Sequence, residues 1–144
     1  MVVLKIPGLE RIISKEPTDH KLIRPDGGTL FVHCAMDAVL YCVVTGETAE
    51  VETRIQGEVK RFPLTPDTTM MMSYIDRRYS DRLPKSSSTP SNRCPFLRFF
   101  DDPVKFEDWR KTLPHHLQEY VTLVSVRDAF TMVEQFVKGV RDRP

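Results

Sequence analysis

The sequence predicts an α+β fold in which an antiparallel sheet is covered on one face by a C-terminal amphipathic helix. Short runs rich in β-branched and aromatic residues follow one another through the first two-thirds of the chain, separated by turn signals. Near the end, apolar residues recur at three- and four-residue spacing from Val126 to Val140, which is the period of a helix with one buried face. Short connections between consecutive strands favour antiparallel pairing, and a helix packed on such a sheet encloses a core.

Turn signals set the limits of the expected strands. Pro25–Gly28 is a turn because proline presets φ and glycine accepts positive φ. Ala38–Val44 has the composition of a strand and ends at Thr45–Thr48, while Glu50–Ile55 shows the period-two alternation of a half-buried strand. In chain order, we expect strands at His20–Arg24, Thr29–Cys34, Ala38–Val44, Glu50–Ile55, Val59–Phe62, Met70–Ile75 and Phe96–Phe100.

The segment before the C-terminal helix has a mixed pattern. Pro114 is suited to the first position of a helix, and apolar residues from Leu117 to Val124 keep a helical period. The phase of this period slips near Ser125. We therefore expect either one kinked long helix or a strand-like break before the final helix.

Composition and charge limit the class of protein. A chain of 144 residues that is 40% hydrophobic and 28% charged is typical of one folded domain, and its net charge of +1 gives no general attraction to nucleic acid or membranes. The N-terminus lacks the basic start and long apolar run of a signal peptide. The longest apolar run, Ala38–Val44, is too short to span a bilayer. We predict a soluble protein of the cytoplasm or nucleus.

The three cysteines are an odd number at irregular spacing, as in reduced intracellular proteins. Zinc ligands usually come in pairs two to four residues apart, whereas Cys34 and Cys42 are eight residues apart and Cys94 is isolated. His33 and Cys34 are adjacent on an expected strand, so their side chains would face opposite sides. We interpret the cysteines as core residues and predict no metal and no cofactor.

Other signals of catalysis are weak. Asp101 and Asp102 could bind a cation or act as acid and base, but a helix cap before Pro103 is the simpler interpretation. Gly27–Gly28 lacks the lysine and the helix pattern of a phosphate-binding loop. The sequence therefore predicts no catalytic residue.

The segment from Asp37 to Arg78 resembles a polo box, the non-catalytic domain in the C-terminal region of polo-like kinases. It has that family's order of an apolar strand, a Thr-Gly turn, an alternating strand, a tight turn and a lysine-containing strand that ends in proline. "MMMSYIDRR" (Met70–Arg78) is similar to the next strand of the family, and Ala129–Asp142 is similar to its closing helix. The resemblance implies a six-stranded antiparallel meander sheet packed against a helix, and a role in protein binding.

The sequence departs from phosphopeptide-binding polo boxes at the phosphate site. Where those domains carry a histidine and a lysine, this chain has Glu58 and Lys60, and a carboxylate beside the lysine weakens the attraction to phosphate. The family's phosphate site also lies between two tandem boxes, and this chain has room for one. The resemblance therefore implies a divergent, phosphate-independent module that recruits or dimerises a cell-division protein at kinetochores, centrioles or the spindle. It implies no enzyme activity, although the module could be the regulatory region of a larger kinase.

Aromatic and basic residues are the candidates for partner binding. Exposed aromatic side chains dominate interfaces, although packing beneath the helix is the alternative for each of them. The predicted partner-binding residues are Lys60, Arg77, Arg78, Phe99, Phe100 and Trp109. We expect a protein partner and self-association into a homodimer, and we expect binding to neither membranes nor nucleic acid.

Three other functions stay open on the residues alone. A pleckstrin-like domain also closes a sheet with a C-terminal helix, but the turn at Pro25–Gly28 lacks the cationic cluster of a phosphoinositide site. The arginines between positions 77 and 98 could bind nucleic acid, although a solvated basic loop is the plainer interpretation. The third alternative is a small enzyme that uses Cys34 or the Asp101–Asp102 pair.

The stretch "RLPKSSSTPSNRCPF" (Arg82–Phe96) bears on domain organisation. Dividing the chain there would leave its C-terminal part with one strand and a helix, too little for a core. We therefore interpret it as part of a loop inserted at about 79–95, flexible because of its length and its Ser and Pro content. Residues 1–36 are expected to form N-terminal strands or an extension, and 37–144 the polo-box-like domain. Thr89, which precedes a proline, is a predicted phosphorylation site.

Overall fold

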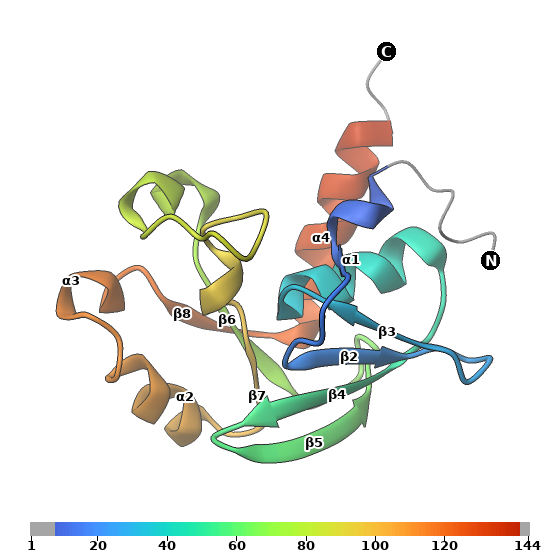
Figure 1. Cartoon of the computed structure of the whole chain (residues 1–144), viewed down its shortest axis with the longest axis horizontal. Helices are drawn as coiled ribbons and strands as arrows, with labels where there is room; N and C mark the ends of the chain where they lie inside the picture. Colours follow the sequence, from blue (N-terminus) through green and yellow to red (C-terminus); the bar gives the residue numbers. More distant parts are fainter. Residues whose placement is uncertain (1–7, 142–144) are drawn as a thin grey trace.

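The structure is a computed structural model, and it describes residues 8–141 (Figure 1). These residues form two antiparallel sheets together with helices and short 3₁₀ turns. In chain order the elements are η2 (Leu9–Arg11), β1 (Ile13–Ser14), β2 (His20–Ile23), β3 (Thr29–Val32), α1 (Ala35–Thr45), β4 (Glu50–Ile55), β5 (Glu58–Pro63), β6 (Met71–Tyr74), η3 (Arg77–Arg82), η4 (Cys94–Phe96), β7 (Phe99–Phe100), α2 (Pro103–Arg110), α3 (His115–Gln118), β8 (Thr122–Ser125) and α4 (Val126–Arg141).

The larger sheet has five strands within residues 8–141, in the order β1-β3-β2-β4-β5, and every pair is antiparallel. Tight turns join its hairpins. Gln56 and Gly57 between β4 and β5 both have positive φ, 50° and 84°, as a two-residue hairpin turn requires. Leu22, Val51 and Ile55 are buried on the face of this sheet that packs against the core. The strands expected at 20–24, 50–55 and 59–62 are thus confirmed to within one or two residues.

The smaller sheet has the order β7-β6-β8, again within the described residues. The α+β class with antiparallel strands is confirmed, but the single six-stranded meander is wrong. After β5 the chain leaves the first sheet, and β6 pairs with β7 and β8, which come from much later in the sequence. The period-two pattern of a strand identifies the strand but not its neighbours, so the division into two sheets was not visible in it.

Helix α1 replaces the strand expected at Ala38–Val44. The helix packs against β2 and β3 of the larger sheet and against α4, and its buried residues are Ala35, Ala38, Val39, Tyr41 and Cys42. Because it has packing partners on more than one side, its apolar residues do not alternate with polar ones at helical spacing. A short continuous apolar run of this kind is compatible with either a buried helix or a buried strand. In this protein the tertiary contacts of the segment determine that it is helical.

The C-terminal helix is confirmed as α4, which lies beside α1 (Figure 1). Its buried face is formed by residues at helical spacing, namely Val126, Ala129, Phe130, Val133 and Val137. The strand-like break expected before it is β8, whereas the short helix after Pro114 is α3. Helix α2 is also confirmed, with Asp102 as its cap: the side-chain carboxylate accepts a hydrogen bond from the Val104 N–H at 2.7 Å.

The segment between β6 and β7 connects two strands of one sheet, because the strands on either side of it pair with each other. It contains η3 and η4 and lies to one side of β6 (Figure 1). The flexible inserted loop expected at about 79–95 stays a prediction. The boundary expected between residues 36 and 37 falls near the start of α1, and β2 before it pairs with β4 after it. Among residues 8–141, none of the helices combines the length and apolar character that crossing a membrane requires.

Candidate active site

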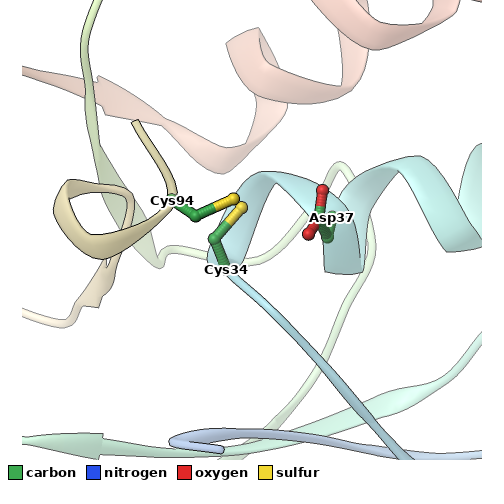
Figure 2. Close-up of side chains that lie close together, drawn as sticks. All are labelled: Cys34, Asp37 and Cys94. Carbon is green, nitrogen blue, oxygen red and sulfur yellow. The ribbon is translucent and has the colours of Figure 1, made fainter. Parts of the chain in front are cut away.

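The side chains of Cys34, Asp37 and Cys94 converge where the first turn of α1 meets η4 (Figure 2). The two Sγ atoms and a carboxylate oxygen of Asp37 lie within 4.8 Å of one another. Figure 2 shows the two sulfur atoms adjacent, with the Asp37 carboxylate beside them on α1. Among the described residues, this is the group of three Cys, His, Asp or Glu side chains placed closely enough to hold one metal ion.

Two of the three residues are placed by the start of α1. Cys34 is the N-cap residue, with an extended backbone (φ −155°, ψ 173°), and its carbonyl accepts the first helical hydrogen bond from Ala38 at 3.2 Å. Asp37 lies three residues later in the first turn, so both side chains are at the same end of the helix. The partial positive charge of a helix N-terminus favours ionisation of both side chains, but their burial opposes it and raises the pKa of each.

Cys94 comes from a distant part of the sequence, the segment between β6 and β7. It begins η4, and its backbone N–H donates to the Ser91 carbonyl at 3.2 Å. A backbone hydrogen bond of 2.9 Å from the Ala35 N–H to the Leu97 carbonyl joins this segment to the start of α1. Leu97 is buried together with both cysteines in a small apolar cluster. The two thiols are therefore adjacent because of main-chain pairing and packing on both sides of the site.

The two thiols differ in acidity. Burial raises the pKa of Cys34 well above its usual value, and its hydrogen bond to Cys94 raises it further. The pKa of Cys94 is lowered instead, chiefly because Cys34 donates a hydrogen bond to its sulfur. Cys94 is therefore the thiol that ionises first, and Cys34 keeps its proton as the donor of the pair.

Asp37 has an unusual carboxyl group. Burial raises its pKa from 3.8 to about 7, although hydrogen bonds from Cys34 and from the His33 backbone and the positive charge of Arg93 all oppose this rise. A carboxyl group with a pKa near neutral can both accept and release a proton under ordinary conditions. It is in contact with the thiol that keeps its proton, so a proton can pass between them.

A surface hollow of about 520 Å³ opens beside the site. Cys94 lines it, together with the neighbouring His33 and residues of the 14–20 and 88–98 segments. Cys34, which is 1% exposed, lies deeper and does not line it. A molecule that enters the hollow thus reaches Cys94 before Cys34.

Comparison with protein families shows which family contains these residues. The family model described as "MerB: Alkylmercury lyase" matches residues 13–138, which is most of the chain. The chain belongs to the alkylmercury lyase family. The matched region includes both cysteines and Asp37 of the site.

Curated relatives agree with this family. An alkylmercury lyase of Pseudomonas putida is 29% identical over 110 residues, covering 73% of this chain and 49% of the relative. An alkylmercury lyase of Staphylococcus epidermidis is 27% identical over 119 residues, covering 81% of this chain and 52% of the relative. The chain spans about half the length of the curated relatives it matches.

A solved structure shows the same fold. The mercury-bound form of MerB2 superimposes with a TM-score of 0.60 at 17% sequence identity, covering 96% of this chain and 73% of that chain. The two-sheet arrangement described above is therefore an alkylmercury lyase fold and not a polo box.

These comparisons overturn the functional predictions made from the sequence. The polo-box resemblance is wrong, because a different family model matches 13–138 and a MerB2 structure shares the fold. The non-enzymatic role is wrong as well, since the family and its curated members are named for an enzyme. Nothing supports the cell-cycle role, the kinetochore, centriole and spindle locations, the pleckstrin-like alternative or the nucleic-acid alternative.

The sequence did not predict the cluster of Cys34, Asp37 and Cys94, in part because the segment after Cys34 was assigned to the wrong type of secondary structure. The sequence predicts strands at Thr29–Cys34 and Ala38–Val44, and neither strand brings the side chain of Asp37 next to that of Cys34. Cysteine is not a usual N-cap residue, and the Cys34 side chain makes no capping hydrogen bond, so the acid three residues later is only a weak local sign of the helix start. No local signal points to Cys94, because its place depends on the fold of the segment between β6 and β7.

The predicted partner-binding residues lie outside the Cys34, Asp37 and Cys94 cluster and do not form one continuous group. Phe99 and Phe100 are buried in the core at 1% and 2% exposure, as the packing alternative for aromatic residues proposed. Lys60 on β5 pairs with Glu58 at 3.1 Å, and Trp109 packs against Phe100 with ring centroids 5.4 Å apart. Partner binding by these side chains stays a prediction.

The remaining predicted residues belong to the segment between β6 and β7. The guanidinium groups of Arg77 and Arg78 stack over the rings of Phe136 and Tyr79, at 5.1 and 4.8 Å from the ring centroids. The Thr89 hydroxyl donates to the Ser91 carbonyl at 2.8 Å. Phosphorylation of Thr89 likewise stays a prediction.

Proposed function

We propose that this chain cleaves the carbon–mercury bond of alkylmercury compounds, releasing a hydrocarbon and leaving mercury(II) bound to two thiolates. The observation that supports the proposal most strongly is the convergence of Cys34, Cys94 and Asp37 within 4.8 Å in a member of the alkylmercury lyase family. Mercury is a soft metal, and thiolates are the protein ligands that soft metals prefer. The third group, a carboxyl with a raised pKa, supplies the proton that cleavage needs.

The first step is capture of the substrate by Cys94. Its thiolate is stabilised by the hydrogen bond from Cys34 and is reached from the hollow. An alkylmercury cation that binds there forms one sulfur–mercury bond. The alkyl group is then held in or near the hollow, with the Asp37 carboxyl within reach of the metal.

The second thiol then completes the binding of mercury. As the Cys34 sulfur bonds to the metal, its proton passes to the ionised Asp37 carboxylate. Two thiolates donate electron density to mercury and make the bound carbon more negative. Asp37 then delivers the proton to that carbon, and the carbon–mercury electron pair becomes the new carbon–hydrogen bond.

The products balance the reactants. One alkylmercury cation, one thiolate and one thiol become a hydrocarbon and a mercury(II) bis-thiolate, and Asp37 returns to its ionised form. Removal of the metal needs competing thiols from solution, since both cysteines are occupied at the end of the reaction. The enzyme contributes proximity of the three groups and a proton donor whose pKa, about 7, is close to the working pH.

The proposal is tested by the release of ethane from ethylmercury in the presence of an excess of a small thiol, measured by gas chromatography of the headspace. We expect release well above the background of the thiol alone. Cys34→Ser, Cys94→Ser and Asp37→Asn are each expected to lower the rate by roughly 100-fold or more, because each removes a ligand or the proton carrier.

The matched control is Cys42→Ser. Cys42 is a buried free cysteine on α1, outside the cluster of three, so its replacement should leave the rate within about threefold of the unmodified chain. A wild-type rate equal to the thiol background would overturn the proposal. So would a folded Asp37→Asn variant that releases ethane as fast as the wild type.

A further inference from the structure

A buried hydroxyl group lies beneath the segment that bears Cys94, and the reaction described above does not use it. Ser73 on β6 is fully buried, at 0% exposure. Its hydroxyl donates to the Phe96 carbonyl at 2.6 Å and accepts from the Arg98 N–H at 2.8 Å. Both partners are main-chain groups within four residues of Cys94.

The position of Ser73 in the sheet explains this arrangement. Regular pairing of β6 with β7 joins Met71 to Phe100 and Met72 to Phe99, and the next residue along β6 is Ser73. The Ser73 N–H still donates to the Arg98 carbonyl at 2.9 Å, but the Arg98 N–H donates to the Ser73 side chain instead of a backbone carbonyl. The hydroxyl therefore ends the β6–β7 ladder and holds the chain where it bends between η4 and β7.

The bend determines where Cys94 lies relative to Cys34. Leu97, between the two groups that Ser73 holds, accepts the hydrogen bond from Ala35 at 2.9 Å, and Ala35 directly follows Cys34. Ser73, the Phe96–Arg98 backbone and the start of α1 thus form one continuous set of hydrogen bonds. A change in the bend alters the separation of the two thiols.

We infer that Ser73 is a positioning residue that sets the separation of the Cys34 and Cys94 thiols for joint binding of one mercury ion. The inference rests on the proposed function for its effect on cleavage, but joint mercury binding can be measured without cleavage. Two thiols held at the right separation bind one ion as a chelate, and the gain over a single thiol depends on how well the pair is preorganised. Loss of the hydroxyl removes a donor and an acceptor at once, and leaves the Arg98 N–H and the Phe96 carbonyl without this partner.

The test compares Ser73→Ala with the wild type in two assays. The first is mercury(II) affinity, measured by competition with a small dithiol, and the second is the rate of ethane release from ethylmercury. We expect an affinity about tenfold lower and a kcat at least tenfold lower, with KM changed less than threefold because capture by Cys94 alone is retained. A folded Ser73→Ala variant with wild-type affinity and kcat would overturn the inference.

Thr45→Val is the matched control for loss of a hydroxyl. Thr45 also donates to a backbone carbonyl, that of Tyr41 at 2.7 Å, and accepts from a backbone N–H, that of Glu47 at 3.2 Å, but it lies at the far end of α1 from the site. Its affinity and kcat should stay within about twofold of the wild type. Equal losses in the two variants would overturn the inference, because they would show a general effect of destabilisation.

A second pair of variants decides the matter if Ser73→Ala does not fold. Ser73→Thr and Ser73→Val have the same shape and differ in whether the hydroxyl is present, so any crowding is common to both. We expect the threonine variant to bind mercury(II) about tenfold more tightly than the valine variant, and equal affinities would overturn the inference. If the wild type binds mercury(II) as a chelate but releases no ethane, the proposed function fails while the affinity comparison still tests Ser73.

Discussion

Asp37→Asn is expected to make the protein more stable at neutral pH while it lowers the rate of cleavage by roughly 100-fold or more. In the folded protein, burial raises the pKa of this carboxyl from 3.8 to about 7. A raised carboxyl pKa means that the folded state binds a proton more tightly than the unfolded state. Stability from this group is therefore present at acidic pH and is lost as the pH rises toward and through about 7. Asparagine has no proton to lose and should remove this dependence.

The size of the effect follows from the shift in pKa. A rise of about three units corresponds to about 4 kcal/mol of lost stability once the pH is well above 7, at 1.36 kcal/mol for each unit. Between pH 5 and pH 7 the loss is about 2 kcal/mol. The free energy of unfolding of Asp37→Asn minus that of the wild type should therefore increase by about 2 kcal/mol over this interval.

The difference between the two proteins is needed because the wild-type curve contains an opposing contribution. Burial lowers the pKa of His20 from 6.5 to about 4, with a further decrease from the charge of Arg98. In this case the unfolded state binds the proton more tightly, so stability is lost as the pH falls from about 6.5 toward 4. The contributions of His20 and Asp37 nearly cancel in the wild type between pH 5 and pH 7, but that of His20 is common to both proteins and disappears from the difference.

The measurement is urea unfolding of both proteins at several pH values from 5 to 7, with the reduced, metal-free protein. A difference that stays constant across this range would refute the argument, since it would show that Asp37 has an ordinary pKa in the folded state. A difference that decreases with pH would refute it more strongly. The expected increase, together with loss of ethane release in Asp37→Asn, would show that the buried carboxyl costs stability where it serves the reaction.

Three further predictions concern mercury binding, a little-exposed ion pair and the oligomeric state. Cys34→Ser should bind mercury(II) through one thiol and lose roughly 100-fold or more in affinity by dithiol competition, and an unchanged affinity would contradict the chelate. Glu47→Ala should lower the free energy of unfolding, measured in urea, by about 2–3 kcal/mol. The reason is that Glu47 pairs with the little-exposed Arg24 at 2.9 Å and accepts a hydrogen bond from the buried Tyr41 hydroxyl at 3.1 Å. The control is Glu50→Ala, which removes an exposed ion pair and should lower the free energy of unfolding by less than about 1 kcal/mol. The homodimer predicted from the sequence stays a prediction, and a monomer mass in light scattering at high concentration would contradict it.

The local elements that the sequence predicted well are those with a clear periodic pattern. The strand at 50–55 alternates at period two, and α4 has apolar residues at helical spacing on one face. Each of these two elements has one buried side and one side that faces solvent. Its apolar residues therefore recur in the sequence with the period of the strand or the helix. Helix α1 has packing partners on more than one side, which removed the period and led to the wrong element.

The candidate site shows the same limit. Cys34 and Asp37 are close in sequence, and a correct assignment of α1 would have brought them together at the helix start. Cys94 is sixty residues after Cys34, and nothing near it in the sequence points to a partner. Its acidity depends on a hydrogen bond from the other thiol, which exists because the two segments are adjacent in the fold.

By itself, the sequence determined an α+β domain with antiparallel strands, a final amphipathic helix and a helix capped by Asp102, because each of these follows from interactions between residues near one another in the chain. Only the tertiary structure decided the division into two sheets, the helical state of residues 35–45 and the meeting of two thiols with a carboxyl group. These features depend on contacts between distant segments, above all the pairing of β6 with β7 and the hydrogen bond from Ala35 to Leu97. The chemistry of the site arises from those contacts, since burial and proximity set the proton affinities of its three groups.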